Sequence, residues 1–135
     1  MRVEGDNNDL RGGTLLSNGI GAHVTSTANG NTFRTATVRN NTHDGVLVDG
    51  SGNTIRDDRI YSNGGNGLKT NATATGTTIK NVQSNIGSPG SSTENAGAEF
   101  LLGVAAINGG SNKADSLNIP SAGKCQTFPA AGPCE

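Results

Sequence analysis

Aromatic and strongly apolar residues are scarce in this chain. Its 135 residues include no tryptophan, one tyrosine and three phenylalanines, and hydrophobic residues make up 31% of the total. A chain of this length holds one domain with a modest core. No stretch of about 18 apolar residues is present, so no segment is expected to cross a bilayer as a helix.

Charge is also scarce, and it is nearly balanced. Charged residues make up 16% of the sequence, and the formal net charge is −1. So small a charge does not attract nucleic acid or an anionic membrane, and one tyrosine without tryptophan leaves almost no platform for base stacking. We therefore expect no nucleic-acid partner. Low charge also argues against disorder, because disordered chains of low hydrophobicity are usually kept soluble by charge.

The two cysteines, Cys125 and Cys134, lie close together near the C-terminal end. The proline and glycine residues between them suit a small loop closed by a disulfide, and hence an oxidising compartment, with a pair of free thiols as the alternative. His23 and His43 are too far away to complete a zinc site with them. The first ten residues are charged and polar where a signal peptide would become apolar.

Glycine is abundant, with 21 residues, and the sequence is periodic. An apolar residue followed by a basic one recurs at spacings of 23, 22 and 24 residues. A second apolar residue and then an asparagine follow in each copy. A period of this length indicates a solenoid of stacked repeats. The three columns are Leu10-Arg11, Phe33-Arg34, Ile55-Arg56 and Ile79-Lys80; Leu15, Val38, Ile60 and Val82; and Asn18, Asn41, Asn63 and Asn85.

A short segment led by glycine follows each asparagine, so each repeat predicts three short strands separated by Gly/Asn turns. Frequent glycine makes a helix costly. Stacking at about 4.8 Å per coil gives each strand parallel neighbours. We expect both apolar columns to point inward and the asparagines to lie at a bend, with their amides bonded between coils and their own backbone left-handed. The glycine-led segments are 19–24, 45–48, 67–70 and, after an inserted loop at 86–96, 97–102.

The segment HDGVLVDGSGNTIRDDRIYSNGGNGLKT at 43–70 resembles repeats of the right-handed parallel β-helix in the pectin-lyase-like superfamily. The segment at 109–134 is similar to the terminal part of secreted bacterial members. The resemblance implies an all-β, right-handed parallel β-helix of about five coils of 22–24 residues at 1–118, and a tail at 119–135. It also implies a secreted or cell-surface protein.

The periodic pattern already runs at Leu10, where members of this superfamily usually carry a cap over the first coil. We therefore expect a C-terminal piece of a longer β-helix, a truncated reading frame, or a short member whose open end is covered by a partner. An open end exposes unpaired strand edges, which favours self-association.

The resemblance implies a carbohydrate-active protein that acts on or binds an acidic polysaccharide, as a lyase, epimerase or glycoside hydrolase. Asp57-Asp58 is similar to the Asp-Asp motif of the pectin hydrolases, and 67–69 is faintly similar to their Arg-Ile-Lys motif. Asn41-Thr42 is followed by His43 rather than aspartate, and no Gly-His-Gly or Asp-Pro-His motif occurs. The alternative is a non-catalytic structural, adhesin or spike module.

Three groups of residues are catalytic candidates. Asp57 and Asp58 offer a pair of carboxylates, but neighbours on a strand point to opposite faces, and the alternative is a solvated turn that offsets the flanking arginines. His43 and Asp44 offer a general base beside a carboxylate, with a simple turn as the alternative. The resemblance implies that Lys69 lies on an outer strand face, where lyases carry a basic catalytic residue.

The basic column is the candidate glycan-binding site. Like charges stacked about 5 Å apart repel by roughly several tenths of a kcal/mol per pair, and a polyuronate or sulfated glycan would offset this repulsion. The alternative is local neutralisation by Asp9, Asp57 and Asp58. We expect no metal site and no cofactor; calcium stays open, without a motif that supports it. The glycan-binding candidates are Arg11, Arg34, Arg56, Lys80 and, for sugar stacking, Tyr61.

Overall fold

The computed structural model describes residues 1–84, 95–103 and 106–114. The regular structure of these residues is entirely β, in three parallel sheets of five strands each. The predicted inserted loop lies mostly outside the described residues, and so do Cys125, Cys134 and the tail at 119–135. Within the described ranges, no helix has the length and hydrophobicity needed to cross a membrane.

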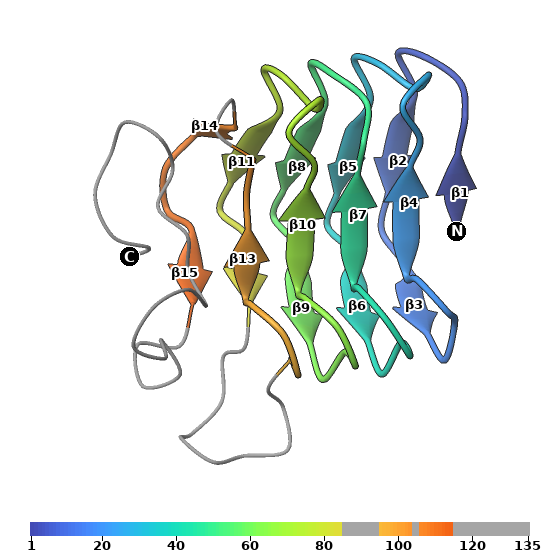
Figure 1. Ribbon diagram of the computed structural model, residues 1–135, viewed down its shortest axis with the longest axis vertical. Coiled ribbons are helices and arrows are strands. Elements are labelled where there is room, and N and C mark those ends of the chain that lie inside the picture. The colour runs from blue at the N-terminus through green and yellow to red at the C-terminus, as the bar shows by residue number, and fades with distance from the viewer. Residues whose placement is uncertain (85–94, 104–105, 115–135) are drawn as a thin grey trace.

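The strands are two or three residues long, and Figure 1 shows those of each sheet side by side along the molecule. Sheet A contains β1 (Arg2–Val3), β4 (Ala22–Val24), β7 (Val46–Val48), β10 (Leu68–Thr70) and β13 (Phe100–Leu101). Sheet B contains β2 (Asp9–Arg11), β5 (Thr32–Arg34), β8 (Thr54–Arg56), β11 (Thr78–Lys80) and β14 (Ile107–Asn108). Sheet C contains β3 (Thr14–Leu16), β6 (Thr37–Arg39), β9 (Arg59–Tyr61), β12 (Gln83–Ser84) and β15 (Lys113–Ala114).

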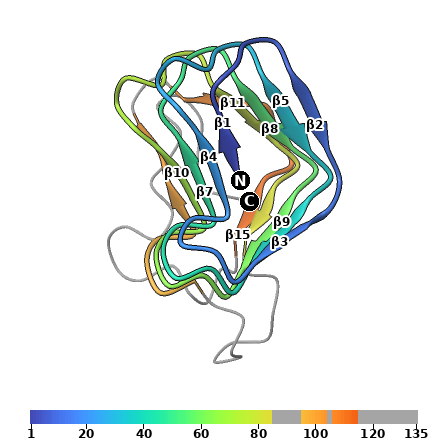
Figure 2. The ribbon, with the colours of Figure 1, turned by 90° about the vertical axis from the view of Figure 1, so that its right-hand side faces the viewer.

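One strand from each sheet forms a coil, which we call a rung, and rungs 1 to 5 begin at β1, β4, β7, β10 and β13. Viewed along the solenoid, the three sheets surround a narrow interior (Figure 2). From β1 to β13 the chain makes about four turns with three strands per turn, and β14 and β15 complete the strands of the fifth rung. The all-β parallel solenoid predicted from the repeat is therefore confirmed.

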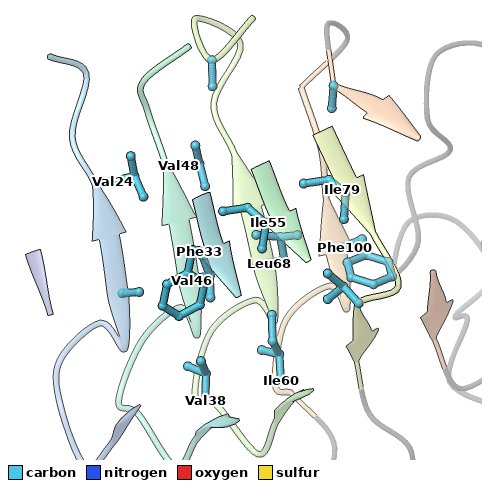
Figure 3. Packing of buried hydrophobic residues seen from close by; sticks show 14 of the residues in the cluster. Val24, Phe33, Val38, Val46, Val48, Ile55, Ile60, Leu68, Ile79 and Phe100 are labelled. Atoms are coloured by element: carbon cyan, nitrogen blue, oxygen red, sulfur yellow. The ribbon is translucent and has the colours of Figure 1, made fainter. Parts of the chain in front are cut away.

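Aliphatic and aromatic side chains fill the interior, and equivalent side chains stack from rung to rung (Figure 3). Phe33, Ile55 and Ile79 are in register on sheet B and are at most 2% exposed. Burying a side chain of this size contributes about 1.5–3 kcal/mol. Leu10, at the end of this stack, is only partly buried because no rung precedes it among the described residues. The first predicted apolar column is confirmed.

The second predicted apolar column is correct in rungs 1 to 3 and wrong in rung 4. Leu15, Val38 and Ile60 are in register on sheet C, but the residue paired with Ile60 is Ser84. Val82 is fully buried two residues earlier, at the corner between sheets B and C. Ser84 thus keeps the spacing of five residues from Ile79, but it is polar where the other members of the column are apolar.

The asparagine column lies at the corner between sheets C and A. The Oδ1 atoms of Asn41, Asn63 and Asn95 accept the backbone N–H one rung earlier, at 3.0, 3.1 and 2.9 Å. The fourth member is therefore Asn95, whereas the predicted Asn85 lies outside the described residues. The left-handed residue is also not the asparagine: it is the residue before it, as at Asn40, where φ is 52°.

Candidate functional site

The predicted basic column forms a continuous row on sheet B. Arg11, Arg34, Arg56 and Lys80 are paired in register on β2, β5, β8 and β11. Because Phe33 and its equivalents point inward, alternation along the strand directs these basic residues outward. We call this row the cation ladder. Its members are separated by one strand spacing, about 4.8 Å.

A second outward column runs parallel to the cation ladder on the same face. Thr32, Thr54 and Thr78 are in register, and Asp9 occupies the equivalent position in rung 1. A threonine hydroxyl both donates and accepts hydrogen bonds. The outer face of sheet B therefore pairs a row of cations with a row of hydroxyl groups, two residues apart along each strand.

Two members of the cation ladder have carboxylate partners. Arg34 donates through Nε to Asp9 Oδ1 at 2.8 Å and forms a second bond to Oδ2. This guanidinium holds the pKa of Asp9 below its ordinary value. Arg56 Nη1 lies 2.6 Å from Asp57 Oδ2, and the Asn81 amide, with Arg56, lowers the pKa of Asp57. The predicted neutralisation by Asp9 and Asp57 is thus present.

The other two members, Arg11 and Lys80, are exposed and form no ion pair within the described residues. They flank the two paired arginines along the row. The neutralisation of the cation ladder is therefore incomplete. An anion over this face meets two cations that form no ion pair within the described residues and two guanidinium groups already held in place by carboxylates.

Further cations lie on sheet C. Arg39, Arg59 and Lys113 occupy outward positions there, and the described strands of sheet C contain no acidic residue. Tyr61 is also on sheet C, in register with Arg39. The structure therefore does not bring Tyr61 onto the face of the cation ladder, and it separates the predicted stacking residue from that row.

The structure also separates the two carboxylates of Asp57-Asp58. The Asp57 side chain is 33% exposed and has φ of 59°, whereas Asp58 is only 1% exposed. The left-handed residue interrupts strand alternation, and the next side chain points inward. A solvated turn is thus right for Asp57 and wrong for Asp58, because Asp58 lies in the interior.

The carboxyl group of Asp58 is buried with too few hydrogen-bond partners, and this changes its pKa. Its Oδ1 accepts the backbone N–H of Ala36 at 2.7 Å, and its Oδ2 is buried with no hydrogen-bond partner. Desolvation raises the pKa of Asp58 to about 7. The desolvation of the buried carboxyl group is the largest cause of the raised pKa, and the charge of the neighbouring Asp57 is a smaller cause.

The predicted dyad of His43 and Asp44 is not formed. His43 is exposed, and the Oδ1 atom of Asp44 accepts both the backbone N–H of Asn66, at 2.8 Å, and its side-chain amide, at 2.7 Å. Asp44 is thus engaged in linking two rungs. This contact occupies the carboxylate that was expected to orient the histidine.

A different histidine meets a carboxylate on the outer face of sheet A. His23 Nε2 lies 2.7 Å from Asp49 Oδ2, and the amide of Asn71 donates to Asp49 Oδ1. Lys69 is on the same face, in the column of His23 with Leu47 between them. The predicted outward position of Lys69 is confirmed. Aligning the repeats so that His23 lies over Leu47 could have revealed the pair of His23 and Asp49. Asp49 follows Leu47 by two residues, so it lies diagonally from His23 in the next rung.

Within the described residues, no group of three or more His, Cys, Asp or Glu side chains is arranged to hold a metal ion. Comparisons with protein-family models, with curated proteins and with solved structures find no match for this chain. The fold and the surface therefore define its class: a parallel β-solenoid with a cationic outer face.

Proposed function

We propose that this protein binds an acidic polysaccharide along the outer face of sheet B. The observation that carries the proposal is the unbroken register of Arg11, Arg34, Arg56 and Lys80, of which the first and last have no carboxylate partner within the described residues. Carboxylate or sulfate groups along a polymer would bind these cations, and the parallel threonine row would hydrogen-bond to sugar hydroxyl groups.

Binding is favoured over cleavage at this face. Asp58 is buried and Asp57 is engaged by Arg56 and Asn81, so the two do not form a pair of carboxylates open to a substrate. A glycan of this kind occurs outside cells, and secretion or display at a cell surface is accordingly part of the proposal. Calcium and other cofactors have no role in it.

The test removes the two unpaired cations. We expect the double variant Arg11→Gln/Lys80→Gln to elute from immobilised polygalacturonate at clearly lower salt than the wild type. Exposed charges act through solvent, so their loss weakens binding without unfolding the chain. The matched control is Arg2→Gln/Lys69→Gln, which removes the same charge from sheet A. Equal elution of both double variants would contradict a site on sheet B.

Catalysis is the second candidate function, and a specific observation favours it. Asp49 holds His23 through Nε2, so the Nδ1 atom of a neutral ring is available as a base on the face that also carries Lys69. The test is to incubate the protein with polygalacturonate, alginate and chondroitin, and to follow unsaturated uronates and new reducing ends. Product formation that is lost in His23→Gln would support a lyase or hydrolase; no product from any polymer would reject these activities.

A further inference from the structure

Several corner asparagines of the solenoid share one hydrogen-bonding rule. The Oδ1 atom accepts the backbone N–H of the equivalent residue one rung earlier. The Nδ2 atom donates to the carbonyl three residues before that equivalent, as Asn41 does to Leu15 at 3.1 Å and Asn63 to Val38 at 3.3 Å, whereas the Nδ2 atom of Asn31 donates to Asn29. At a second corner, Asn53 donates to Ala28 at 3.0 Å. One side chain thus satisfies a donor and an acceptor of the preceding rung.

Asp58 occupies such a position at the corner between sheets B and C. The register aligns it with Ala36, Val82 and Asn112 in neighbouring rungs. Asn112 follows the rule, because its Oδ1 accepts the N–H of Val82 at 3.0 Å and its Nδ2 donates to Ile79 at 2.8 Å. Asp58 reproduces the first of these bonds through Oδ1, which accepts the N–H of Ala36.

The second bond requires a donor that a carboxylate lacks. The position equivalent to the Ile79 carbonyl is, for Asp58, the carbonyl of Phe33, three residues before Ala36. A carboxylate oxygen facing a carbonyl oxygen in the interior is repelled, whereas the O–H of a neutral acid reproduces the amide bond. The buried, partnerless Oδ2 is the atom that this bond would use.

We infer that Asp58 is a neutral carboxylic acid whose O–H donates to the Phe33 carbonyl, and that its ionisation weakens glycan binding at the cation ladder. The second half rests on the proposed function. Arg56, the third member of the ladder, lies two residues before Asp58 and is one of the charges that act on it. A negative charge formed beneath the ladder competes with the anionic polymer for this guanidinium.

Few other groups near Asp58 can produce a similar pH response. On its own segment the charged neighbours are Arg56, Asp57 and Arg59, and the aligned residues Ala36 and Val82 do not ionise. The pKa of Asp57 is lowered, which keeps that group charged at neutral pH. The flanking strands of the adjacent rungs add only the cations Arg34, Arg39 and Lys80, and the buried Glu99 bonds to Ser84 and Asn95 at another corner.

The experiment measures affinity for polygalacturonate at pH 5.5 and pH 8.5 at one ionic strength. The carboxyl groups of the polymer, arginine and lysine keep their charges across this range. We expect the wild type to bind about threefold more weakly at pH 8.5, as expected for one added charge several ångströms from the ligand. Asp58→Asn, whose amide donates at both pH values, should bind equally at both.

His43 supplies the matched control, because it is exposed and lies in a turn outside the strands of sheet B. His43→Gln should keep the wild-type pH response. A wild type without a pH response, the same response in Asp58→Asn, or loss of the response in His43→Gln would overturn the regulation.

Thermal unfolding separates the two halves of the inference. A neutral Asp58 predicts a lower melting temperature for the wild type at pH 8.5 than at pH 5.5, and little change for Asp58→Asn. Absence of glycan binding at both pH values would reject the proposed function and the regulation together. The thermal comparison would still decide whether Asp58 is a neutral acid in the corner.

Discussion

At the scale of the residue, Asp58 makes the stability of the protein depend on pH. Burial raises the pKa of Asp58 to about 7, from an ordinary value of 3.8. The unfolded chain therefore loses this proton at lower pH than the folded protein does. The free energy of unfolding falls as pH rises between about 4 and 7, by about 1.4 kcal/mol per pH unit at most, and is level above that range.

We predict that urea unfolding will show this profile in the wild type and that Asp58→Asn will abolish it. The lowered pKa values of Asp9 and Asp57 act in another range, because the stability they contribute is lost only below their ordinary pKa. Asp58→Asn should therefore be the more stable protein at pH 8 and should lose this advantage at pH 4. A wild-type stability that increases from pH 5 to pH 8 would contradict a neutral Asp58.

The same residue shows where prediction from sequence ends. Aligned repeats place Asp57 and Asp58 correctly in a connecting segment between two strands. The alternation rule then assumes extended backbone, and the left-handed conformation at Asp57 breaks that assumption. One aspartate is thereby directed into the interior, which composition and spacing alone do not reveal. The His23 and Asp49 pair was missed for a related reason, because it is formed diagonally between rungs.

At the scale of the element, the corner between sheets C and A contributes to stability through buried amides. Asn41 is 2% exposed and bonds to the backbone of Asn18 and Leu15 in the preceding rung. Asn41→Ala leaves the N–H of Asn18 and the carbonyl of Leu15, which are partly buried in this contact, without these partners. An unsatisfied buried group costs about 1–3 kcal/mol, and these two groups are only partly buried, so we predict a loss of about 2 kcal/mol in the free energy of unfolding, measured in urea.

Asn18→Ala is the matched control for this prediction. Asn18 belongs to the same column, but it is exposed, and its amide donates to Leu16 in its own rung and to the side chain of Asn41 in the next rung, not to the backbone of another rung. Its loss should therefore cost less than about 1 kcal/mol. Equal destabilisation by the two variants would show that the asparagines act by local turn preference and not by bonds between rungs.

The strands were easier to predict than the details of the corners. A period of 22–24 residues is sufficient to align Phe33, Ile55 and Ile79, because parallel stacking repeats every side chain at the same place. Ser84 escaped prediction because the apolar Val82 lies close by, at a corner position that is also buried. Asn95 was not predicted because an insertion separates it from the preceding strand. The asparagine keeps its place in the coil but comes later in the sequence than the period of the repeat predicts.

At the scale of the whole molecule, the near-zero net charge conceals an uneven distribution of charge, because the described strands carry cations and the described acidic residues other than Asp9 lie between them. The described strands of sheets B and C carry outward cations from Arg11 to Lys113, and Asp9 is the acidic residue among them. A net charge of −1 is therefore compatible with a polyanion on one side of the solenoid. The net charge of a sequence can exclude a polyanionic partner only when the fold distributes charge evenly over the surface. In a solenoid each column of side chains lies on one face, so a single face can be cationic.

The ends of the solenoid carry the last prediction, which is self-association. Within the described residues, strands β1, β2 and β3 are each paired on one side, Leu10 and Leu15 are partly buried, and Leu16 is 44% exposed. At the other end of the stack, Ile107 of β14 is 50% exposed. Unpaired parallel edges with apolar neighbours favour pairing with another chain. We expect the sedimentation coefficient to increase with protein concentration.

Two substitutions distinguish the modes of association. Leu16→Glu places a charge beside the edge of rung 1, and Ile107→Glu places one in rung 5. Stacking of one end on the other predicts that either variant weakens association, and such a contact does not close, so oligomers should grow with concentration. Pairing of two first rungs predicts a dimer that is disrupted by Leu16→Glu alone. A wild type that sediments as a monomer at all concentrations would exclude both modes, and would mean that the edges are protected in solution.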